Sequence, residues 1–448
     1  MRVLWLTNLM LPAYARAKGL PWSDREGWLS GCYDRVIDGS LPVELGVAFP
    51  GNGGQLTPGR GEMLEPDGVR FYVFPEDLTH PECYDPALES ALRAILTDFH
   101  PDLVHVFGTE FPHTLALLRT CEAAGIPRNR VLISLQGICG EIAAHYMDGL
   151  AGRVQGSRSI RDRIRRDSLA EQQQKMAQRG EREAEALKLA VHVAGRTDFD
   201  RRSVLGINPS LQYHVLQETM RGVFYSGETW TGPRRPHTLF ASQGDVPFKG
   251  LHRLLMAMPQ LLAAYPYAHL YVAGNSVIGA PDRSSVTVPD EQQGSTSQRQ
   301  RVKVPQWLKI SGYGKYLQEL IRIHHLSAHV TVLGSLSAAQ MKEQLLSCET
   351  FVCPSTIENS PNSLAEAMLL GVPCVTAAVG GIPSMAGDGR EALFFHRDEE
   401  LTETILRLWG DQALERQLGA QARERALGQH DPAANAAALL GVYKEMMR

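Results

Sequence analysis

Short apolar runs alternate with helical stretches along most of the 448 residues, and this alternation constrains the fold more than any other feature. Helical stretches such as PALESALRAILTDF and KGLHRLLMAMPQLLAAY separate the expected strands. Because strands joined by helices pair in parallel and are covered by those helices, the pattern predicts an α/β fold with mainly parallel sheets. The expected strands are RVLWLTNL, VELGVAF, VRFYVF, LVHVFG, RVLISLQ, AVHVAG, LQYHVL, HTLFASQ, HLYVAG, HVTVLG, TFVCPS and PCVTA.

The length of the chain predicts two domains, since one hydrophobic core rarely organises more than roughly 250–300 residues. A stretch with Gly and Pro, SGETWTGPRRPH, separates the two series of strands and is the best candidate for a linker. We therefore expect a Rossmann-like N-terminal domain over residues 1–228 and a Rossmann-like C-terminal domain over residues 229–428. Residues 429–448 have a helical pattern.

Two polar stretches interrupt the alternation. Residues 151–189 predict a charged helical arm of the N-terminal domain, and its sequence RSIRDRIRRDSL places five arginines around Ile160 and Ile164. A basic amphipathic helix can contact an anionic membrane surface, but the two aspartates of this sequence favour a solvated arm. The segment between Gly279 and Val304 is poor in apolar residues, and we expect it to be a mobile surface insertion.

Composition argues against several classes of protein. The formal net charge of −4 gives no reason to expect a nucleic-acid partner. No apolar run approaches the ~20 residues that span a bilayer, and the first residues lack a typical secretory leader, so we expect a cytoplasmic protein. The seven cysteines occur singly and without the spacing of a zinc site, which predicts reduced thiols and no metal site.

The strongest chemical signal is the window TFVCPSTIENSPNSLAEAMLLGVPCVTAAVGGIP, residues 350–383. It predicts a strand, a polar loop, a helix and a further strand. We expect Ser360 to be the N-cap of the helix and Pro361 to be its first residue. The loop then lies at the carboxyl end of a parallel sheet, where open α/β sheets bind their ligands.

The start of this helix predicts a phosphate site flanked by two carboxylates. Amides in the first turn have no acceptor in their own helix, and with the helix dipole they can bind a diphosphate. A carboxylate accepts hydrogen bonds from paired hydroxyls, which suits a ribose at Glu366 and a hexose at Glu358. The expected amide donors are Asn362, Ser363 and Leu364. Two solvated glutamates in an ordinary strand-helix-strand unit would be the alternative.

This window resembles the paired-glutamate motif of retaining glycosyltransferases of the GT-B fold, in particular glycosyltransferase family 4 (group 1). The resemblance covers most of the chain. It implies two Rossmann-like domains whose parallel sheets face across a cleft, with residues 429–448 as a terminal helix that packs back toward the N-terminal domain. It also implies a metal-independent hexosyltransferase without a cofactor, whose donor substrate is a UDP- or GDP-sugar.

The acceptor implied by the resemblance is a glycan or a lipid-linked molecule in polysaccharide or glycoconjugate biosynthesis. A lipid-linked acceptor would suit peripheral contact with the inner face of the membrane. Glu358 would bind the hydroxyls of the donor sugar and Glu366 the ribose of the nucleotide.

A second element of the site is the stretch FASQGDVPFKGLHRLL, in which Lys249 precedes a helix. A lysine there could neutralise the donor phosphates as the leaving group departs, so we expect it to act in catalysis together with Glu358. Gln243 is a candidate for donor binding. The family usually has an arginine five residues before the lysine, where this chain has Gly244. Either another basic residue replaces that arginine or the phosphates are held differently.

The N-terminal domain offers weaker candidates. Gly27 resembles part of a Gly-Gly loop near the donor phosphates, although a glycine before a helix also fits an ordinary turn. Glu110 and His145 follow expected strands and could face the sugar or the acceptor, but a lone histidine is more often structural. Arg196 could meet a phosphate or an acceptor, or pair with an aspartate of its own AGRTDFD sequence.

Two other classes of function stay open. One is a sugar-nucleotide epimerase or a phosphorylase on the same fold, because a fold does not fix the chemistry. The other is a catalytically inactive protein that binds nucleotide sugars, which the missing arginine would suit. An NAD-linked dehydrogenase is disfavoured because no Gly-x-Gly-x-x-Gly loop follows the first strand.

Overall fold

A computed structural model of the chain describes residues 1–20, 27–51, 60–64, 67–275, 278, 279, 282, 284, 286 and 310–448. Most of the polar segment that follows Gly279 lies outside the described residues. The chain divides into two compact units. Unit 1 comprises Met1–Ala143, Lys175–Thr219 and His430–Arg448, and unit 2 comprises Ala144–Gln174 and Met220–Gln429.

Unit 1 is built on a sheet with the strand order β3-β4-β2-β1-β5-β6-β7-β8. The neighbouring strands are parallel except for β3 and β4, which are antiparallel. All the strands expected here form, and the three-residue β3 is additional. Their bounds are β1 Arg2–Leu6, β2 Glu44–Pro50, β3 Glu62–Leu64, β4 Val69–Phe74, β5 Leu103–Phe107, β6 Val131–Ser134, β7 His192–Gly195 and β8 Gln212–Val215.

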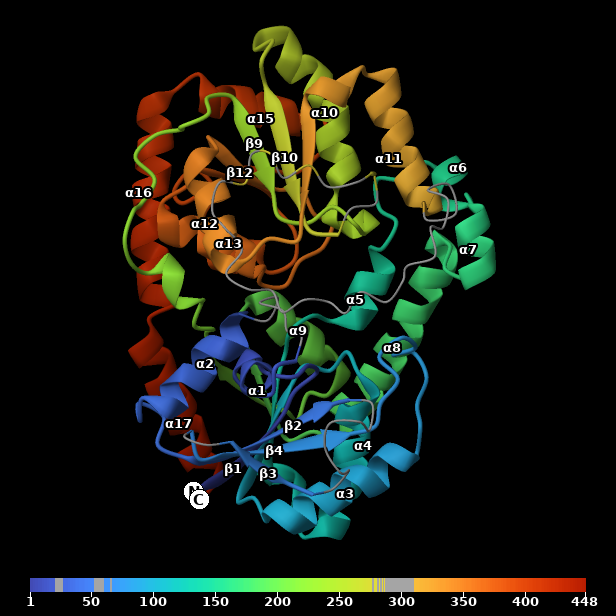
Figure 1. Ribbon diagram of the computed structural model, residues 1–448, viewed down its shortest axis with the longest axis vertical. Coiled ribbons are helices and arrows are strands. Elements are labelled where there is room, and N and C mark those ends of the chain that lie inside the picture. The colour runs from blue at the N-terminus through green and yellow to red at the C-terminus, as the bar shows by residue number, and fades with distance from the viewer. Residues whose placement is uncertain are drawn as a thin grey trace. The chain divides into compact units, whose positions relative to one another are not determined.

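Helices of unit 1 cover this sheet, and the core lies between them and the strands. The ring of Phe99 packs where a Cβ on Gly46 would approach it to 2.9 Å, so the strand needs glycine there. In the C-terminal helix, the hydroxyl of Tyr443 accepts a hydrogen bond from Trp5 of β1 at 3.1 Å. Strand β1 lies close to both termini in Figure 1. The helices of unit 1 are α1 Pro12–Ala17, α2 Gly27–Ile37, α3 Ala87–Phe99, α4 Pro112–Thr120, α9 Asp198–Ile207 and α17 Pro432–Met446, and α5 Cys139–Ala144 and α8 Leu169–Leu189 cross the unit boundary.

Unit 2 contains a parallel sheet with the order β11-β10-β9-β12-β13-β14 (Figure 1). The chain builds outward from β9 to β11, then crosses back and continues from β12 to β14. Strands β9 and β12 are neighbours, so the direction of winding reverses between them. Their bounds are β9 Thr238–Ala241, β10 His269–Ala273, β11 Val330–Gly334, β12 Thr350–Cys353, β13 Cys374–Ala377 and β14 Leu393–Phe395.

The helices of unit 2 include those of the charged arm. The sequence placed residues 151–189 in the N-terminal domain, whereas residues 144–174 belong to unit 2. The α-helices that lie wholly in unit 2 are α6 Gly152–Gln155, α7 Ile160–Arg165, α10 Leu251–Ala264, α11 Gly312–Ile323, α12 Ala338–Ser347, α13 Asn362–Leu370, α14 Ile382–Met385, α15 Glu400–Trp409 and α16 Gln412–Gln429.

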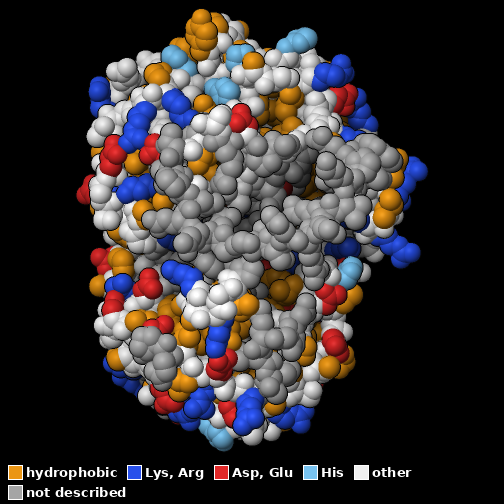
Figure 2. Space-filling model, viewed as in Figure 1, with side chains coloured by type: hydrophobic (Ala, Val, Ile, Leu, Met, Phe, Trp, Pro, Cys, Tyr) orange, Lys and Arg blue, Asp and Glu red, His pale blue; other side chains and the backbone are white. Residues whose placement is uncertain are grey.

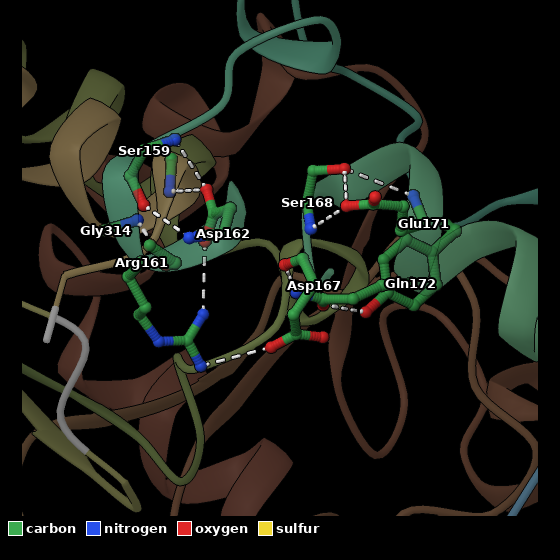
Figure 3. A network of polar contacts seen from close by, with 11 residues as sticks. Ser159, Arg161, Asp162, Asp167, Ser168, Glu171, Gln172 and Gly314 are labelled. Carbon is green, nitrogen blue, oxygen red and sulfur yellow. Dashed lines mark hydrogen bonds and ion pairs between the residues drawn. The ribbon is translucent and has the colours of Figure 1, made fainter. Parts of the chain in front are cut away.

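A polar network explains why the arm packs in unit 2 (Figure 3). Ser159 caps α7, and the carboxylate of Asp162 accepts a hydrogen bond from the Ser159 amide at 2.9 Å. The same buried carboxylate accepts the amide of Gly312 at 2.7 Å, at the start of α11. Arg161 bridges Asp162 at 3.2 Å and Asp167 at 3.1 Å. The sequence predicts a charged, solvated arm, but the buried carboxylate of Asp162 anchors this arm to the start of α11.

Candidate functional site

The site expected from the sequence lies at the carboxyl ends of β9 and β12. Open parallel sheets bind ligands where the winding direction reverses, because the loops after the two neighbouring strands diverge and leave a crevice. The loop after β9 carries Lys249, and the loop after β12 carries Glu358. Unit 2 thus brings both expected catalytic residues to its switch point.

Lys249 and Glu358 form an ion pair, with 2.6 Å between Nζ and Oε1. The hydroxyl of Ser355 donates a second hydrogen bond to this oxygen at 2.7 Å. The two side chains are 21% and 9% exposed, so the pair is largely shielded from water. Burial alone lowers the pKa of Lys249, but the charge and hydrogen bond of Glu358 outweigh it and raise the pKa. The lysine is a fixed cation at neutral pH.

Gly250 and Arg253 allow the loop that carries Lys249 to pack on the loop that carries Glu358. Gly250 has a φ of 74°, and a Cβ there would lie 2.0 Å from the carbonyl oxygen of Pro354. Arg253 donates to the same carbonyl at 2.6 Å and to Asp398 at 2.7 Å. The loop that carries Lys249 therefore packs directly on the loop that carries Glu358. Arg253 was not identified from the sequence. The glycine directly after Lys249 was the one local sign that another backbone segment packs closely against this loop.

The glycine pair of the VGGIP sequence supports Glu358 from the other side. Gly380 has a φ of 51°, and a Cβ there would lie 2.0 Å from the carbonyl oxygen of Glu358. The amide of Gly381 donates to that carbonyl at 2.9 Å. A side chain at position 380 could not be accommodated without moving the Glu358 backbone.

The first turn of α13 differs from the expectation in two respects. Pro361 is the N-cap, with φ −70° and ψ 118°, so the helix begins at Asn362 and Ser360 is not the cap. The amide of Leu364 donates to the Pro361 carbonyl at 3.0 Å and is not a free donor. The amides of Asn362 and Ser363 occupy the first two helical positions, where no acceptor exists within the helix. Two of the three expected phosphate donors are thus available.

Around this turn, the hydroxyls of Ser242 and Ser363 are 2.9 Å apart and join the loop after β9 to α13. Gln243 follows in the same loop with an exposed side chain. Gly244 is buried, and a Cβ there would already lie 2.5 Å from the Leu251 side chain. The Leu251 side chain would have to move to accommodate the arginine that the resemblance would place at this position.

Glu366 lies inside α13 and is paired with Arg221. One carboxylate oxygen, Oε1, accepts from Nε at 2.8 Å and lies 2.7 Å from Nη2. The guanidinium also lies over the ring of Phe224 at 5.0 Å. Sequence reasoning missed Arg221, and no local pattern marks it.

His145 belongs to unit 2 and not to the N-terminal domain in which the sequence placed it. Its carbonyl accepts the hydroxyl of Thr356 at 3.0 Å, two residues before Glu358. Its ring is half exposed and lies 2.6 Å from the carboxylate of Asp148. The histidine is thus tied by its backbone to the Glu358 loop.

The other three candidates lie in unit 1. Gly27 is buried at the start of α2. Glu110 follows β5, next to the reversal of winding between β1 and β5, and its Oε1 accepts the amide of Gly137 at 2.7 Å. The guanidinium of Arg196 pairs with buried Glu218, and only its backbone amide binds Asp200, at 3.0 Å.

Comparison with known proteins supports the assignment of the second half of the chain. Residues 234–425 match the family described as glycosyl transferases group 1. Alpha-maltose-1-phosphate synthase of Mycolicibacterium smegmatis is 31% identical over 119 residues. That match covers 25% of this chain and 31% of the relative, so the chain spans about a third of the relative's length.

Solved structures match both units. Sucrose-phosphate synthase of Thermosynechococcus elongatus has a TM-score of 0.67 at 14% identity, with 99% of both chains covered. Anabaena HepE in complex with UDP-glucose has a TM-score of 0.64 at 15% identity, with 99% of this chain and 100% of HepE covered. The predicted fold class is confirmed: the chain has two parallel-sheet α/β domains of the GT-B type.

Two features are absent from the residues that the structure describes. No described helix is long and apolar enough to cross a membrane. No cluster of three or more His, Cys, Asp or Glu side chains suited to a metal ion occurs among the residues that the structure describes.

Proposed function

We propose that this chain is a retaining glycosyltransferase of family 4, which transfers a hexose from a UDP- or GDP-sugar to a glycan or lipid-linked acceptor. The observation that carries the proposal is the shielded Lys249–Glu358 pair at the switch point of unit 2, 2.6 Å between charged atoms. A cation and a carboxylate fixed beside a helix start suit a sugar joined to a diphosphate.

The roles follow from charge and position. The amides of Asn362 and Ser363 would receive the diphosphate, and Lys249 would neutralise it as the bond to the sugar breaks. Glu358 would bind sugar hydroxyls and Glu366 the ribose hydroxyls. Lys249 and Glu358 already balance each other's charge. The nucleotide sugar would contact both, with its diphosphate at Lys249 and its sugar at Glu358.

In the transfer step, the acceptor hydroxyl attacks the anomeric carbon on the face that the nucleotide leaves. A new glycosidic C–O bond forms as the bond to the diphosphate oxygen breaks. The acceptor proton moves to the departing phosphate, so no side chain need act as nucleophile or base. The anomeric configuration is retained, and we propose that no metal ion takes part.

Similarity supports this function over its rivals. The group 1 match contains Lys249, Glu358 and Glu366, and the related HepE fold was solved with UDP-glucose. Neither finding favours an epimerase, a phosphorylase or an inactive binding protein. Unit 1 would supply the acceptor side, with Glu110 beside its own switch point. Gly27, Gln243, His145 and Arg196 stay proposed contributors to donor or acceptor binding.

The arm of unit 2 is a candidate for peripheral membrane contact. Ile160 is 48% exposed and Ile164 is 70% exposed. Arginines of α7 and its flanks are exposed beside them, and Figure 2 shows blue side chains around orange ones at the right edge, where α6 and α7 lie in Figure 1. Apolar groups ringed by cations suit an anionic lipid surface that presents the acceptor.

The test begins with binding of UDP- and GDP-sugars, measured by the rise in melting temperature, because a ligand that binds only the folded state raises it. Transfer to candidate acceptors is then followed by nucleotide release, and NMR of the product gives its anomeric configuration. We expect Glu358→Gln to abolish transfer while Glu424→Gln, an exposed glutamate of α16, leaves it unchanged. Inversion of configuration, loss of activity with EDTA, or full activity of Glu358→Gln would contradict the proposal.

A further inference from the structure

Unit 1 contains a cavity of about 50 Å³, and of its lining residues only Arg196 has a role in the proposed transfer. Its walls come from the carboxyl halves of β5, β6 and β7, from the segment after β8, and from α2 and α17. Apolar side chains, among them Phe107, Leu135 and Leu439, form part of the lining. The remaining wall is polar.

Five buried polar atoms of this lining have no hydrogen-bond partner among the described residues. Three are donors, namely Nε of Arg35, Nε of Arg196 and Nδ2 of Asn435. Two are acceptors, namely Oε1 of Gln217 and Oε2 of Glu218. Folded proteins rarely bury such atoms unpaired, since each has lost its hydrogen bonds to water without gaining a partner. Their convergence on one cavity indicates an occupant that both donates and accepts.

A relay of hydrogen bonds adds a fourth donor. Trp5 donates to the Tyr443 hydroxyl, which therefore donates its own proton to Nδ1 of His105, 2.6 Å away. Burial lowers the pKa of His105 to about 3, so the ring is neutral and its proton resides on Nε2. Nε2 then donates to Ser134 Oγ at 2.7 Å. The proton of the Ser134 hydroxyl is left to face the cavity, which this residue lines.

The charges of the lining are already balanced. Arg196 pairs with Glu218, and Arg35 pairs with Asp38 at 2.8 Å. A dianion would repel the unpaired Glu218 oxygen and could not donate to it. A hydroxyl group accepts and donates at once, so a molecule with three hydroxyls could serve four donors and two acceptors. Its C–H groups would rest on the apolar part of the wall.

We propose that this cavity is a binding site for a small neutral polyol of about three carbons. The volume sets the size of the ligand. One water needs ~10–15 Å³ of such a cavity, so the cavity holds roughly three to five waters or one glycerol-sized molecule. Every residue named for this site lies in unit 1. Arg196 is the one residue among them that is also a proposed contributor to the transfer reaction.

Saturation-transfer NMR on the full chain tests this inference, with glycerol as the probe and 1,3-propanediol as a matched probe that lacks the central hydroxyl. We expect saturable glycerol binding and about tenfold weaker binding of the diol, because the diol leaves buried partners unpaired. Ala436→Leu, which fills the cavity, and Asn435→Leu, which removes a donor, should each weaken glycerol binding about tenfold or more. Lys444→Ala, an exposed change on the same helix, should leave it unchanged.

Thermal melting and circular dichroism establish whether each variant folds. If one of the two cavity variants does not fold, the other still tests the inference. Equal affinity for glycerol and the diol would overturn the inference, as would glycerol binding that survives both cavity variants. Absence of saturable glycerol binding would mean that the cavity holds only water. Preferential binding of inorganic phosphate, followed by 31P NMR, would replace the neutral ligand with an anion and likewise refute the proposal.

Discussion

Glu366 is held by Arg221, a residue 145 positions earlier in the chain, whose Nε and Nη2 both approach the single oxygen Oε1. The two side chains are 5% and 14% exposed, so the pair is nearly excluded from water. Each charge is costly to bury alone, and the pair persists because each compensates the other. The carboxylate proposed to bind ribose is therefore oriented by a segment outside the motif that contains it.

Arg221→Ala should destabilise unit 2 by about 3 kcal/mol, because it removes the guanidinium that pairs with the buried Glu366 carboxylate. The double variant Arg221→Ala/Glu366→Gln should recover part of that loss, since it also removes the buried negative charge that Arg221 compensates. Arg234 is the control, because it pairs with Glu228 and Glu343 at the surface, and its change to Ala should cost under ~1 kcal/mol. Urea denaturation at neutral pH measures all three. An equal effect of the two arginines would show that burial does not strengthen the Glu366 pair.

Lys249→Met should reduce kcat by about 10²–10³-fold, the usual effect of removing one group that stabilises developing charge. The raised pKa keeps the wild-type lysine protonated well above neutral pH, so the variant's deficit should be constant between pH 6 and 9. Lys315→Met, an exposed change on α11, should have no effect. Steady-state kinetics across this pH range provides the measurement, and a deficit that appears only in KM would assign Lys249 to ground-state binding alone.

Substitution of two glycines with positive φ angles distinguishes the cost of a strained backbone from the cost of a steric clash. Gly380 and Gly389 have φ values of 51° and 70°. A Cβ on Gly380 would lie 2.0 Å from the Glu358 carbonyl, whereas a Cβ on Gly389 would meet nothing within 4 Å. We expect Gly389→Ala to cost about 1–2 kcal/mol for the left-handed backbone. Gly380→Ala should cost more and also weaken donor binding, as measured by denaturation and by titration with the nucleotide sugar.

Much of the fold and of the Glu358 site could be predicted because short stretches of the sequence determine them. The strands alternate with helices, and the glutamates stand in one short window, so the fold class and the Glu358 loop follow from pattern. The N-cap was wrong by one residue because Pro361 adopts an extended ψ of 118°, which a preference for serine caps cannot reveal. Arg221 could not be found, since its contact with Glu366 exists only after the chain folds. The three-residue strands β3 and β14 were too short to give a pattern.

Glu183 makes a prediction about pH that is independent of the transfer reaction. Burial raises its pKa to about 8, the hydrogen bond from Thr109 opposes that rise, and the nearby charge of Glu110 adds to it. The folded state therefore keeps a proton that the unfolded state releases above about pH 4.5. Stability from this group is complete below that pH and falls as pH rises toward 8, by at most ~1.4 kcal/mol per pH unit.

Glu183→Gln removes the titrating proton while keeping a neutral polar group of the same size. The difference in unfolding free energy between this variant and the wild type should shift in favour of the variant from pH 5 to pH 8, because only the wild type loses stability through Glu183. Glu181→Gln, an exposed neighbour on α8, should show no such trend. Urea denaturation at intervals of half a pH unit gives the slopes. A pH-independent difference for Glu183→Gln would mean that this carboxyl is ionised in the folded protein, and that the buried environment around Thr109 is more polar than the structure describes.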